Sequence, residues 1–522
     1  MHKNVPEIEI NEQFRKALEL LDHTQKNVFI TGKAGTGKST LLKYFREHTR
    51  KNIVVLAPTG VAALNVGGET IHSFFRFKPD ITPDKVKKAR GRNADVYKKL
   101  HAIVIDEVSM VRADLLDCVD AFLRMNGPSS MSPFGGLQMI FIGDLYQLPP
   151  VVSGNERGLF SSHYAGPYFF NAKVMDGLEL EFVELEKIYR QKDAGFINIL
   201  NAIRNNSATE RELAVLNKRV GAALEKTQNE GYTVNLLATN KAAYEINSAH
   251  LSALKDEEHV YPAQIDGGFS KESYPADEML VIKKGAQVML LNNDPAGRWV
   301  NGSMGEVADL TAEPESGEEV IVVRLSDGGF EKVKPHAWEL FHFTYDREAG
   351  KVVTETAGVF RQYPLKLAWG ITIHKSQGKT FERAVIDFGR GMFAHGQAYV
   401  ALSRCVSLEG MSLTRALRGS DILMDWRVVK FLTSHQYKLS ERALPLADKV
   451  TLINKAIAAG KNLEMTYLKA GDEKSRRVVK PFRLGSKVFM NREFLGMDCF
   501  CLDRKSERVF RVDRILELKL CL

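Results

Sequence analysis

A glycine-rich loop near the start of the chain is the feature that most limits how this sequence can fold. Residues 32–39 read GKAGTGKS and match the phosphate-binding pattern G-x-x-x-x-G-K-[ST] at every position. An apolar run of strand type, residues 27–31, precedes the loop, and an amphipathic segment of helix type, residues 39–45, follows it. The alternative is a chance glycine-rich turn, which would not need a strand before it and a helix after it. Phosphate binding needs both, because it uses the turn and the helix N-terminus together. Lys38 is therefore expected to reach the β- and γ-phosphates of a nucleotide, and the Ser39 hydroxyl to bind Mg²⁺.

Composition indicates a soluble protein of several domains. At 522 residues the chain is too long for one hydrophobic core, and 44% hydrophobic with 26% charged residues is ordinary for a globular protein. No apolar run reaches the length that spans a membrane, and the N-terminal residues resemble neither an export nor an import signal. The five cysteines are scattered, and the Cys499–Cys501 spacing does not suit a zinc pair. We expect reduced thiols in a cytoplasm and no membrane partner.

The positive charge is concentrated at the C-terminal end. The chain carries a net charge of +8, and residues 446–522 contain 17 Lys and Arg against 10 Asp and Glu. A basic tail on a near-neutral body favours a polyanionic partner, nucleic acid first. The alternative is a solvated basic surface without a ligand.

The first part of the chain predicts a buried parallel sheet. Four apolar runs separated by helical segments are typical of an α/β domain, and polar motifs follow several of them, where ligands bind in such sheets. The runs are residues 27–31, 53–56, 101–105 and 137–142.

Two of the polar motifs predict catalytic groups. Asp106 and Glu107 end the third run, and as the partner of a phosphate-binding loop they are expected to hold Mg²⁺ and to activate the attacking water, respectively. Gln147, in residues 143–150, is a candidate sensor of the γ-phosphate, with an ordinary loop glutamine as the alternative.

The remaining chain contains a second α/β unit and two β-rich segments. Short strand-like runs between glycine-rich turns predict a small β-barrel in residues 251–359, and a second small β-domain beyond residue 449. Residues 75–100 predict a small, exposed, wedge-like insertion, and the polar, proline-containing residues 435–448 predict a linker.

The ordered set of motifs resembles the Pif (petite integration frequency) family of superfamily-one helicases, which are related to RecD-type enzymes. The resemblance covers about residues 8–434, and the segment at 133–138 is similar to a signature of this family. The motifs lie at residues 57–63, 70–75, 105–110, 133–138, 143–150, 189–191, 374–378 and 399–404.

The resemblance implies the fold class α/β, with two RecA-like parallel-sheet domains. A small SH3-like β-barrel is inserted in the second domain, and a C-terminal Sm-like β-domain resembles a WYL domain, although residues 493–495 read EFL in place of the naming tripeptide. The implied boundaries are 1–185 for the first motor domain, 186–250 with 360–434 for the second, 251–359 for the insertion, 435–448 for the linker and 449–522 for the WYL-like domain.

The resemblance also implies the residues of an ATP site. Gln13 matches the glutamine that reads adenine, and Arg190 and Arg404 match two arginines that the second lobe brings to the γ-phosphate. An ordinary surface ion pair is the alternative for Arg190. The expected catalytic residues are Lys38, Asp106, Glu107, Gln147, Arg190 and Arg404. The expected contacts to ATP are Gln13, Gly32, Ala34, Gly35, Thr36, Gly37, Lys38, Ser39, Thr40 and Gly378, with Ser39 and Asp106 as Mg²⁺ ligands.

Further residues match motifs that line a single-strand path in the family. They are Pro58, Thr59, Val61, His72, Phe74, His374, Lys375, Ser376 and Gln377. A core position is the alternative for Phe74 and its neighbour Phe75, and a buried, hydrogen-bonded histidine for His72. In the WYL-like tail, the expected contacts to nucleic-acid phosphates are Arg476, Arg477, Lys480, Arg483, Arg508 and Arg511.

The function implied by the resemblance is ATP-dependent 5′-to-3′ DNA unwinding by a motor that moves on single-stranded DNA. Forked and tailed duplexes are the expected partners, G-quadruplexes and RNA–DNA hybrids remain open as further ones, and a monomer associated with a bacterial nucleoid is expected. Two other functions stay open: a translocase that does not separate strands, and a nucleotide-gated binding protein in which the tail is the main actor.

Overall fold

The computed structural model describes residues 10–89, 94–152, 157–191, 193–224, 231–269, 271–313, 317, 319–489 and 491–521. The chain divides into two compact units, which are described separately. Unit 1 contains Met1–Arg204 and Ala208–Leu423, and unit 2 contains Asn205–Ser207 and Met424–Leu522. No described helix combines the length and the apolarity needed to cross a membrane.

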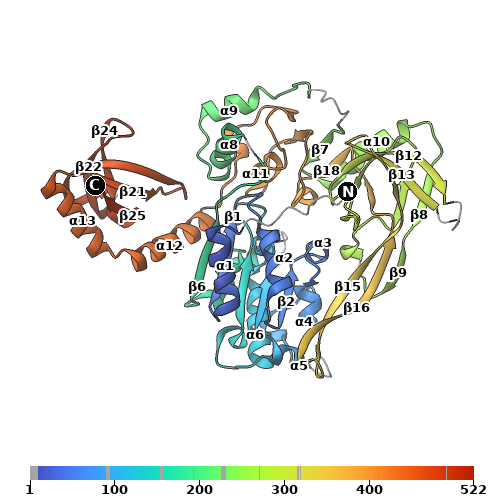
Figure 1. Ribbon diagram of the computed structural model, residues 1–522, viewed down its shortest axis with the longest axis horizontal. Helices are drawn as coiled ribbons and strands as arrows, with labels where there is room; N and C mark the ends of the chain where they lie inside the picture. Colours follow the sequence, from blue (N-terminus) through green and yellow to red (C-terminus); the bar gives the residue numbers. More distant parts are fainter. Residues whose placement is uncertain are drawn as a thin grey trace. The chain divides into compact units, whose positions relative to one another are not determined.

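The first part of unit 1, called lobe 1, is a parallel sheet with helices around it (Figure 1). Its strand order is β3-β2-β4-β5-β1-β6, and all neighbours are parallel. The strands are β1 (Asn27–Gly32), β2 (Ile53–Ala57), β3 (Glu69–Thr70), β4 (Ala102–Ile105), β5 (Gln138–Ile142) and β6 (Leu180–Leu185). The helices are α1 (Glu12–His23), α2 (Lys38–His48), α3 (Gly60–Asn65), α4 (Ile71–Phe75), α5 (Ala94–Lys99), α6 (Ala113–Asn126) and α7 (Arg157–His163).

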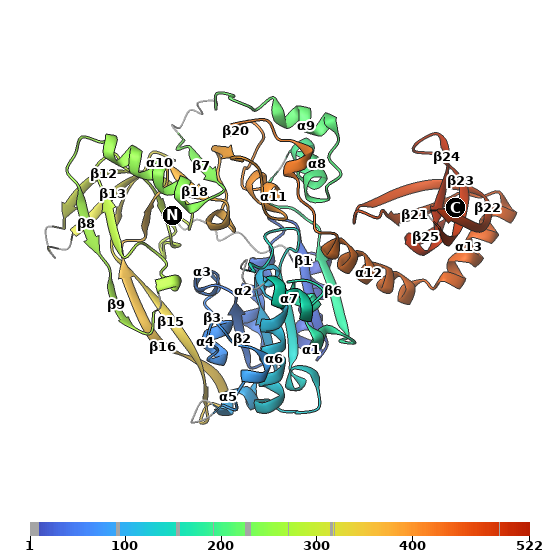
Figure 2. The same ribbon diagram turned by 180° about the vertical axis from the view of Figure 1, so that it is seen from behind.

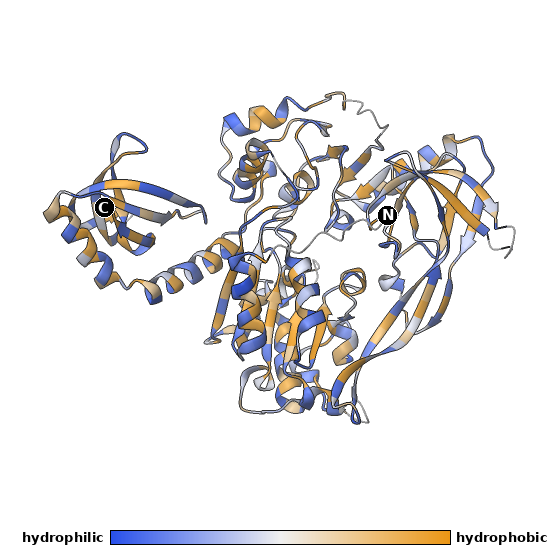
Figure 3. Cartoon of the chain, in the orientation of Figure 1, coloured by the Kyte–Doolittle hydropathy of each residue, from blue (hydrophilic) through white to orange (hydrophobic). Residues whose placement is uncertain are grey.

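Hydrophobic burial explains why these segments form a sheet. Every residue of β4 and β5 is buried, and the apolar faces of α1 and α2 cover the strands through residues such as Phe14, Leu21 and Leu41. Figure 3 shows the same arrangement, with mostly hydrophobic strands inside helices of mixed character. Since the strands are parallel, the loops after β1, β4 and β5 meet at one edge of the sheet.

The second RecA-like domain, called lobe 2, has its own parallel sheet in the order β18-β7-β19-β20. The strands are β7 (Val234–Leu237), β18 (Gly370–Thr372), β19 (Ala384–Asp387) and β20 (Met411–Leu413). Its helices are α8 (Ala194–Arg204), α9 (Glu210–Asn217), α10 (Asn240–Ala253) and α11 (Gln397–Leu402). The expected α/β fold with two RecA-like domains is confirmed.

The predicted β-insertion separates β7 from β18 in the sequence and contains antiparallel sheets. Its main sheet has the order β14-β13-β12-β11-β17, so pairing of β17 with β11 extends it beyond the expected end at residue 359. The strands are β8 (His259–Pro262), β9 (Gln264–Gly267), β10 (Met279–Ile282), β11 (Gln287–Leu290), β12 (Met304–Ala312), β13 (Glu319–Leu325), β14 (Phe330–Val333), β15 (His336–Asp346), β16 (Lys351–Gln362) and β17 (Leu365–Leu367).

A long hairpin of this insertion, β15–β16, lies against lobe 1 beside α5 in both views (Figures 1 and 2). His342 Nδ1 is 2.7 Å from the buried Glu69 carboxylate, and the Phe343 ring packs edge-on against Phe74. The expected wedge at residues 75–100 is only partly exposed, because Phe75 and Tyr97 are buried against Phe122 of α6. Residues 90–93 of that segment lie outside the described residues.

Unit 2 is an antiparallel sheet with two helices. The strand order is β24-β23-β22-β21-β25, and Ile453 and Ala456 pack into the core of the sheet. The helices are α12 (Trp426–Ala443) and α13 (Leu446–Ala459), and the strands are β21 (Leu463–Leu468), β22 (Lys474–Phe489), β23 (Arg492–Cys501), β24 (Ser506–Arg511) and β25 (Ile515–Leu520).

The segment 435–448, expected as a linker, is helical except at a short break. The helix α12 runs through to Ala443, and α13 begins at Leu446 after Pro445. The expectation failed because the polar residues of this segment have buried partners. The Ser440 hydroxyl donates to the carbonyls of Ile515 and Leu516, and Lys449 donates to the Ser440 oxygen.

Candidate functional site

The phosphate-binding loop joins β1 to α2 and has the backbone that its glycines allow. Gly35 and Gly37 have φ values of 79° and 87°, and a Cβ on Gly35 would lie 2.6 Å from the Cβ of Arg190. Since no side chain caps α2, its first backbone N–H groups are suited to bind an anion. The Lys38 ammonium donates to the carbonyl oxygens of Gly32 at 2.7 Å and Lys33 at 3.1 Å, so it stays inside the loop.

The acidic pair lies at the end of β4. Burial raises the pKa of Asp106 to about 7, the Glu107 charge adds to this shift, and Lys38 opposes it. Burial likewise raises the pKa of Glu107, against the effect of Lys38 and Arg404. Two buried carboxylates with raised pKa values are a suitable environment for a divalent cation, because a cation restores the charged form that burial disfavours.

The residues of this site suit Mg²⁺ better than a metal ion that takes three or more side-chain ligands from the protein. Within the described residues there is no group of three or more His, Cys, Asp and Glu that could hold a metal ion. Mg²⁺ commonly uses one or two protein oxygens together with phosphates and waters. Asp106 and Ser39, the two predicted ligands, would match that number, and the Ser39 residue is exposed.

Two arginines that follow β6 in the sequence, Arg190 and Arg404, lie near the phosphate loop and the acidic pair. Arg404 is 1% exposed, and its Nη1 donates to the carbonyl oxygens of Ser376 and Lys379. Arg190 Nη1 donates to the Ser403 carbonyl at 3.2 Å, while the Tyr189 N–H donates to Gly35 of the phosphate loop. Burial lowers the pKa of both arginines, and Arg190 adds to the shift of Arg404. Arg190 therefore joins lobe 2 to the phosphate loop and is not in an ordinary surface ion pair.

Hydrogen bonds hold the side-chain amides of both Gln147 and Gln13. Gln147 Nε2 donates to Asp144 Oδ2 at 3.3 Å, and its Oε1 accepts from Gln377 Nε2 at 3.4 Å. Gln13 Oε1 accepts from the Glu186 N–H at 3.0 Å, which fixes the amide at the start of α1. The structure thus gathers Lys38, Asp106, Glu107, Gln147, Arg190 and Arg404. Thr40 and Gly378 are exposed, and the adenine role of Gln13 remains a prediction.

Two of the residues that lie at this site, Tyr399 and Arg204, were not predicted from the sequence as site residues. The Tyr399 hydroxyl accepts from the Ala34 N–H at 3.0 Å and so links α11 to the phosphate loop. Tyr399 stands inside a predicted motif, which was the available signal. Arg204 contacts Asp144 from α8, but nothing in its local sequence pointed to the site.

The residues expected along a single-strand path follow the ends of β2, β3 and β18. Thr59 and Val61 are exposed, Lys375 is exposed, and Pro58, His374 and Gln377 are half-buried. His72 is half-buried too, and burial lowers its pKa and that of His374. Neutral imidazoles at these positions would contact DNA by hydrogen bonding and stacking instead of by charge.

Two expected DNA contacts have buried side chains. Phe74 is 4% exposed and packs against Phe75, Tyr97 and Phe343, so the core alternative describes its ring in this structure. Ser376 is fully buried, and its hydroxyl donates to the Ile373 carbonyl. Neither side chain is presented to a strand here, because local packing and hydrogen bonding already use them.

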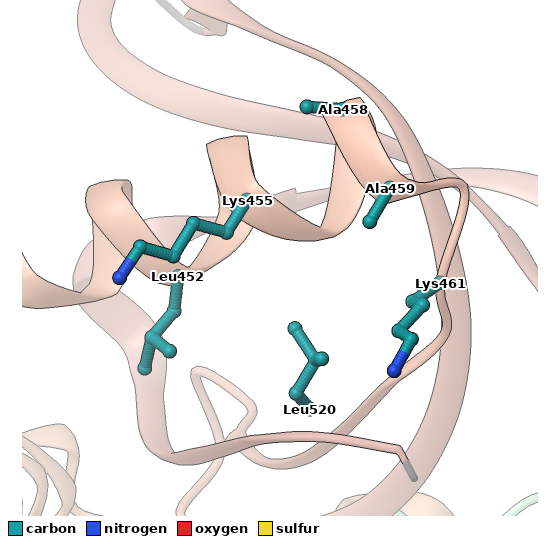
Figure 4. A pocket seen from close by; sticks show the side chains of 6 residues that line it. All are labelled: Leu452, Lys455, Ala458, Ala459, Lys461 and Leu520. Carbon is teal, nitrogen blue, oxygen red and sulfur yellow. The ribbon is translucent and has the colours of Figure 1, made fainter.

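The basic residues of unit 2 do not converge on one point. Arg477 and Arg508 line one pocket, together with Tyr467, Lys469, Ser475, Arg504, Val509 and Phe510. Arg483 and Arg511 form ion pairs with Asp498 and Asp513, and Arg476 and Lys480 are exposed elsewhere on β22. A second, more apolar hollow lies between α13 and β25 (Figure 4). It is lined by Leu452, Lys455, Ala458, Ala459, Lys461 and Leu520.

Comparisons with known proteins agree with this arrangement. The family model described as PIF1-like helicase matches residues 9–213, and the WYL domain model matches residues 448–520. The chain is 33% identical over 438 residues to ATP-dependent DNA helicase Pif1 of Bdellovibrio bacteriovorus, covering 82% of this chain and 92% of that protein. It is 34% identical over 396 residues to human ATP-dependent DNA helicase PIF1, covering 74% of this chain but only 58% of the human protein.

The fold comparison gives the same family. The crystal structure of Bacteroides sp Pif1 in complex with ADP-AlF4 has a TM-score of 0.75 at 37% identity, covering 83% of this chain and 98% of that one. Bacteroides Pif1 bound to ssDNA has a TM-score of 0.59 at 37% identity, covering 84% of this chain and 97% of that one. With its two RecA-like lobes, its site at their junction and a C-terminal WYL domain, the chain belongs to the PIF1-like helicase family.

Proposed function

We propose that this protein is an ATP-dependent DNA helicase that moves 5′ to 3′ on single-stranded DNA. The observation that carries the proposal is the meeting of two sets of groups at one place. Lys38, Asp106 and Glu107 come from lobe 1, while Arg404 of lobe 2 lies close enough to Glu107 to lower its pKa. Both lobes contribute residues to the nucleotide site. Binding and hydrolysis of ATP therefore change the contacts between the two lobes.

Each group has a role in hydrolysis of ATP. The N–H groups of the loop and Lys38 bind the phosphates, and Ser39 and Asp106 would hold Mg²⁺, which would neutralise phosphate charge. Glu107 orients the attacking water and accepts its proton, a task suited to a carboxylate whose pKa is raised by burial. Arg190 and Arg404 stabilise the negative charge that grows in the transition state.

The strand path runs over both lobes. Thr59 and Val61 on lobe 1 and His374, Lys375 and Gln377 on lobe 2 provide contacts that do not depend on base sequence. Gln377 also donates to Gln147, so one amide pair connects the strand path with the predicted γ-phosphate sensor. Alternate gripping by the two lobes converts hydrolysis into stepping along the strand.

The wider partners are part of the same proposal. Bacteroides Pif1 was solved bound to ssDNA, and another solved structure concerns DNA unwinding at forked dsDNA by two coordinating Pif1 helicases, which supports tailed and forked duplexes as substrates here. The WYL domain acts as an auxiliary single-strand-binding module through the pocket of Arg477, Arg504 and Arg508. G-quadruplexes and RNA–DNA hybrids are further candidate substrates, and the protein acts as a monomer in solution.

The test is unwinding of one duplex that carries a single-stranded tail at either its 5′ or its 3′ end. We expect ATP-dependent unwinding from the 5′ tail only, and none with K38A, which lacks the phosphate-binding ammonium. Unwinding from the 3′ tail alone would contradict the direction. ATP consumption on single strands without unwinding of either substrate would identify a translocase instead.

A further inference from the structure

The loop that carries Gln147 is fixed by a residue from lobe 2. The Arg204 guanidinium, at the end of α8, lies 3.3 Å from the carboxylate of Asp144, which follows β5. The two side chains are 3% and 0% exposed, respectively. The same guanidinium is 3.9 Å from the centre of the Tyr146 ring, so it holds the loop at two points. A buried pair of this kind is costly to separate, because each partner would become an uncompensated charge.

The Asp144 carboxylate in turn orients Gln147. Its Oδ2 accepts from Gln147 Nε2, and its Oδ1 accepts from the Tyr146 N–H at 3.1 Å as well as from Arg204. Because Gln377 holds the other end of the Gln147 amide, the nitrogen and the oxygen are both fixed. The direction of this amide therefore depends on a carboxylate whose counter-charge belongs to the other lobe.

The pair also acts on the phosphate loop through its charge. Burial lowers the pKa of the Lys38 ammonium, the Asp144 carboxylate opposes that shift, and the Arg204 guanidinium adds to it. The same three effects act on Lys33. The ion pair thus lies beside the groups that bind phosphate and not in a remote part of the interface between the lobes.

We propose that Arg204 is a positioning residue of the ATP site. As lobe 2 closes on lobe 1, Arg204 binds Asp144, and Asp144 holds the Gln147 amide where it meets the γ-phosphate. Arg190 and Arg404 act on the phosphates directly, whereas Arg204 acts through a carboxylate of lobe 1. The inference rests on the proposed function, since it assigns a role within ATP hydrolysis.

Lobe 2 contains a matched control. Arg415 forms an ion pair with Asp421 at 2.8 Å, and its guanidinium lies 5.6 Å from the centre of the Phe388 ring. Like Arg204, Arg415 contacts both a carboxylate and an aromatic ring, but all three of these residues belong to lobe 2. Removing it costs folding stability without touching the loop of Gln147.

The experiment compares R204M, R204K and R415M in ATP hydrolysis with and without single-stranded DNA, alongside thermal unfolding. We expect R204M to lower the DNA-stimulated kcat by roughly 10- to 100-fold while KM for ATP changes by less than about threefold, because the contacts that bind ATP are intact. R204K should restore part of kcat, since it keeps the charge but not the planar fork. R415M should keep kcat within about twofold, because the ion pair and the ring contact that it removes lie within lobe 2 and do not involve the loop of Gln147.

The variant D144N tests the route from Arg204 to Gln147. If both residues act on one amide, the double variant R204M/D144N should be about as slow as the slower single variant, and not the product of the two losses. The inference is overturned if folded R204M and R204K both keep kcat near the wild-type value, or if R415M loses kcat by the same factor as R204M. A wild-type protein whose hydrolysis does not respond to single-stranded DNA would instead overturn the proposed function.

Discussion

Asp106 is the residue at which catalysis and folding stability are most directly opposed. Its carboxylate must be ionised to hold Mg²⁺, but burial and the neighbouring Glu107 raise its pKa to about 7. In the unfolded chain its pKa returns to the ordinary value near 3.8. Between these two values the folded state binds the proton more tightly, so this carboxylate makes the protein less stable as pH rises through that window.

Replacing Asp106 by asparagine should therefore stabilise the protein without nucleotide. At pH 8 we expect D106N to raise the free energy of unfolding of lobe 1 by about 1–2 kcal/mol, a typical gain when a functional charge is removed. The gain should shrink as pH falls below 7 and disappear only near pH 4, where the carboxylate becomes protonated in the unfolded chain as well. Mg²⁺-dependent hydrolysis of ATP should be lost at every pH.

Thermal unfolding from pH 5 to pH 8 with excess EDTA measures this difference. The variant D176N, at an exposed carboxylate of the same lobe, is the control and should show no pH-dependent gain. If D106N were less stable than the wild type at pH 8, the buried carboxylate would not be a source of strain.

At the scale of residues, the motifs predicted which residues would lie together but not which side chains would be buried. Lys38, Asp106 and Glu107 belong to local patterns at a strand end or a helix start, so the sequence could predict that they lie near one another. Tyr399 and Arg204 act through contacts with residues far away in the sequence, and tertiary packing alone creates those contacts. The same holds for Phe74, whose ring faces the core and not a strand.

At the scale of elements, an aromatic cluster joins α4, α5, α6 and the insertion's hairpin. Phe74 lies 5.3 Å from the Tyr97 ring and 6.0 Å from the Phe343 ring, and the Tyr97 hydroxyl donates to the Phe74 carbonyl. Because these rings come from separate segments, the cluster fixes the expected wedge and the β15–β16 hairpin onto lobe 1. We expect loss of this cluster to lower folding stability more than it weakens DNA binding.

We expect F74A to lower the free energy of unfolding by about 3–5 kcal/mol, the usual cost of removing a buried phenyl ring. Urea unfolding followed by circular dichroism measures this loss. F330A is the control, since Phe330 is 64% exposed on β14, and it should change stability by less than about 0.5 kcal/mol. A stable F74A protein with weakened single-strand binding would instead support a stacking role for Phe74.

The sequence predicted the buried strands of lobe 1 but not the helix α12, and the difference has a physical reason. The strands β1, β2, β4 and β5 of lobe 1 are almost wholly buried, so each reads as an apolar run in the sequence. The helix α12 is amphipathic and contains polar residues such as Gln436 and Ser440, whose hydrogen-bond partners Asp472 and Ile515 lie far along the chain in unit 2. Residues 435–448 therefore appeared as a linker in the sequence.

At the scale of the whole molecule, the basic charge is carried largely by unit 2. Deleting the tail from residue 446 would be a poor test of its role, because Ser440 of α12 would lose its partners on β25. Substitution of exposed residues in the intact chain avoids that problem. The pocket of Arg477, Arg504 and Arg508 provides suitable residues, because Arg504 and Arg508 are exposed and Arg477 is half-buried.

The variant R477E/R504E/R508E should weaken single-strand binding and flatten its dependence on salt. Each lost phosphate contact lowers the slope of log Kobs against log[salt] by about 0.7, so three lost contacts should lower it by about 2. K455E/K461E/K519E changes the net charge by the same amount on another face of unit 2, at and beside the hollow of Figure 4. If both variants changed the slope equally, unit 2 would contribute only general positive charge, and the pocket would have no specific role. A slope lowered by the first variant alone would show that DNA phosphates enter the pocket, because the two variants have the same net charge.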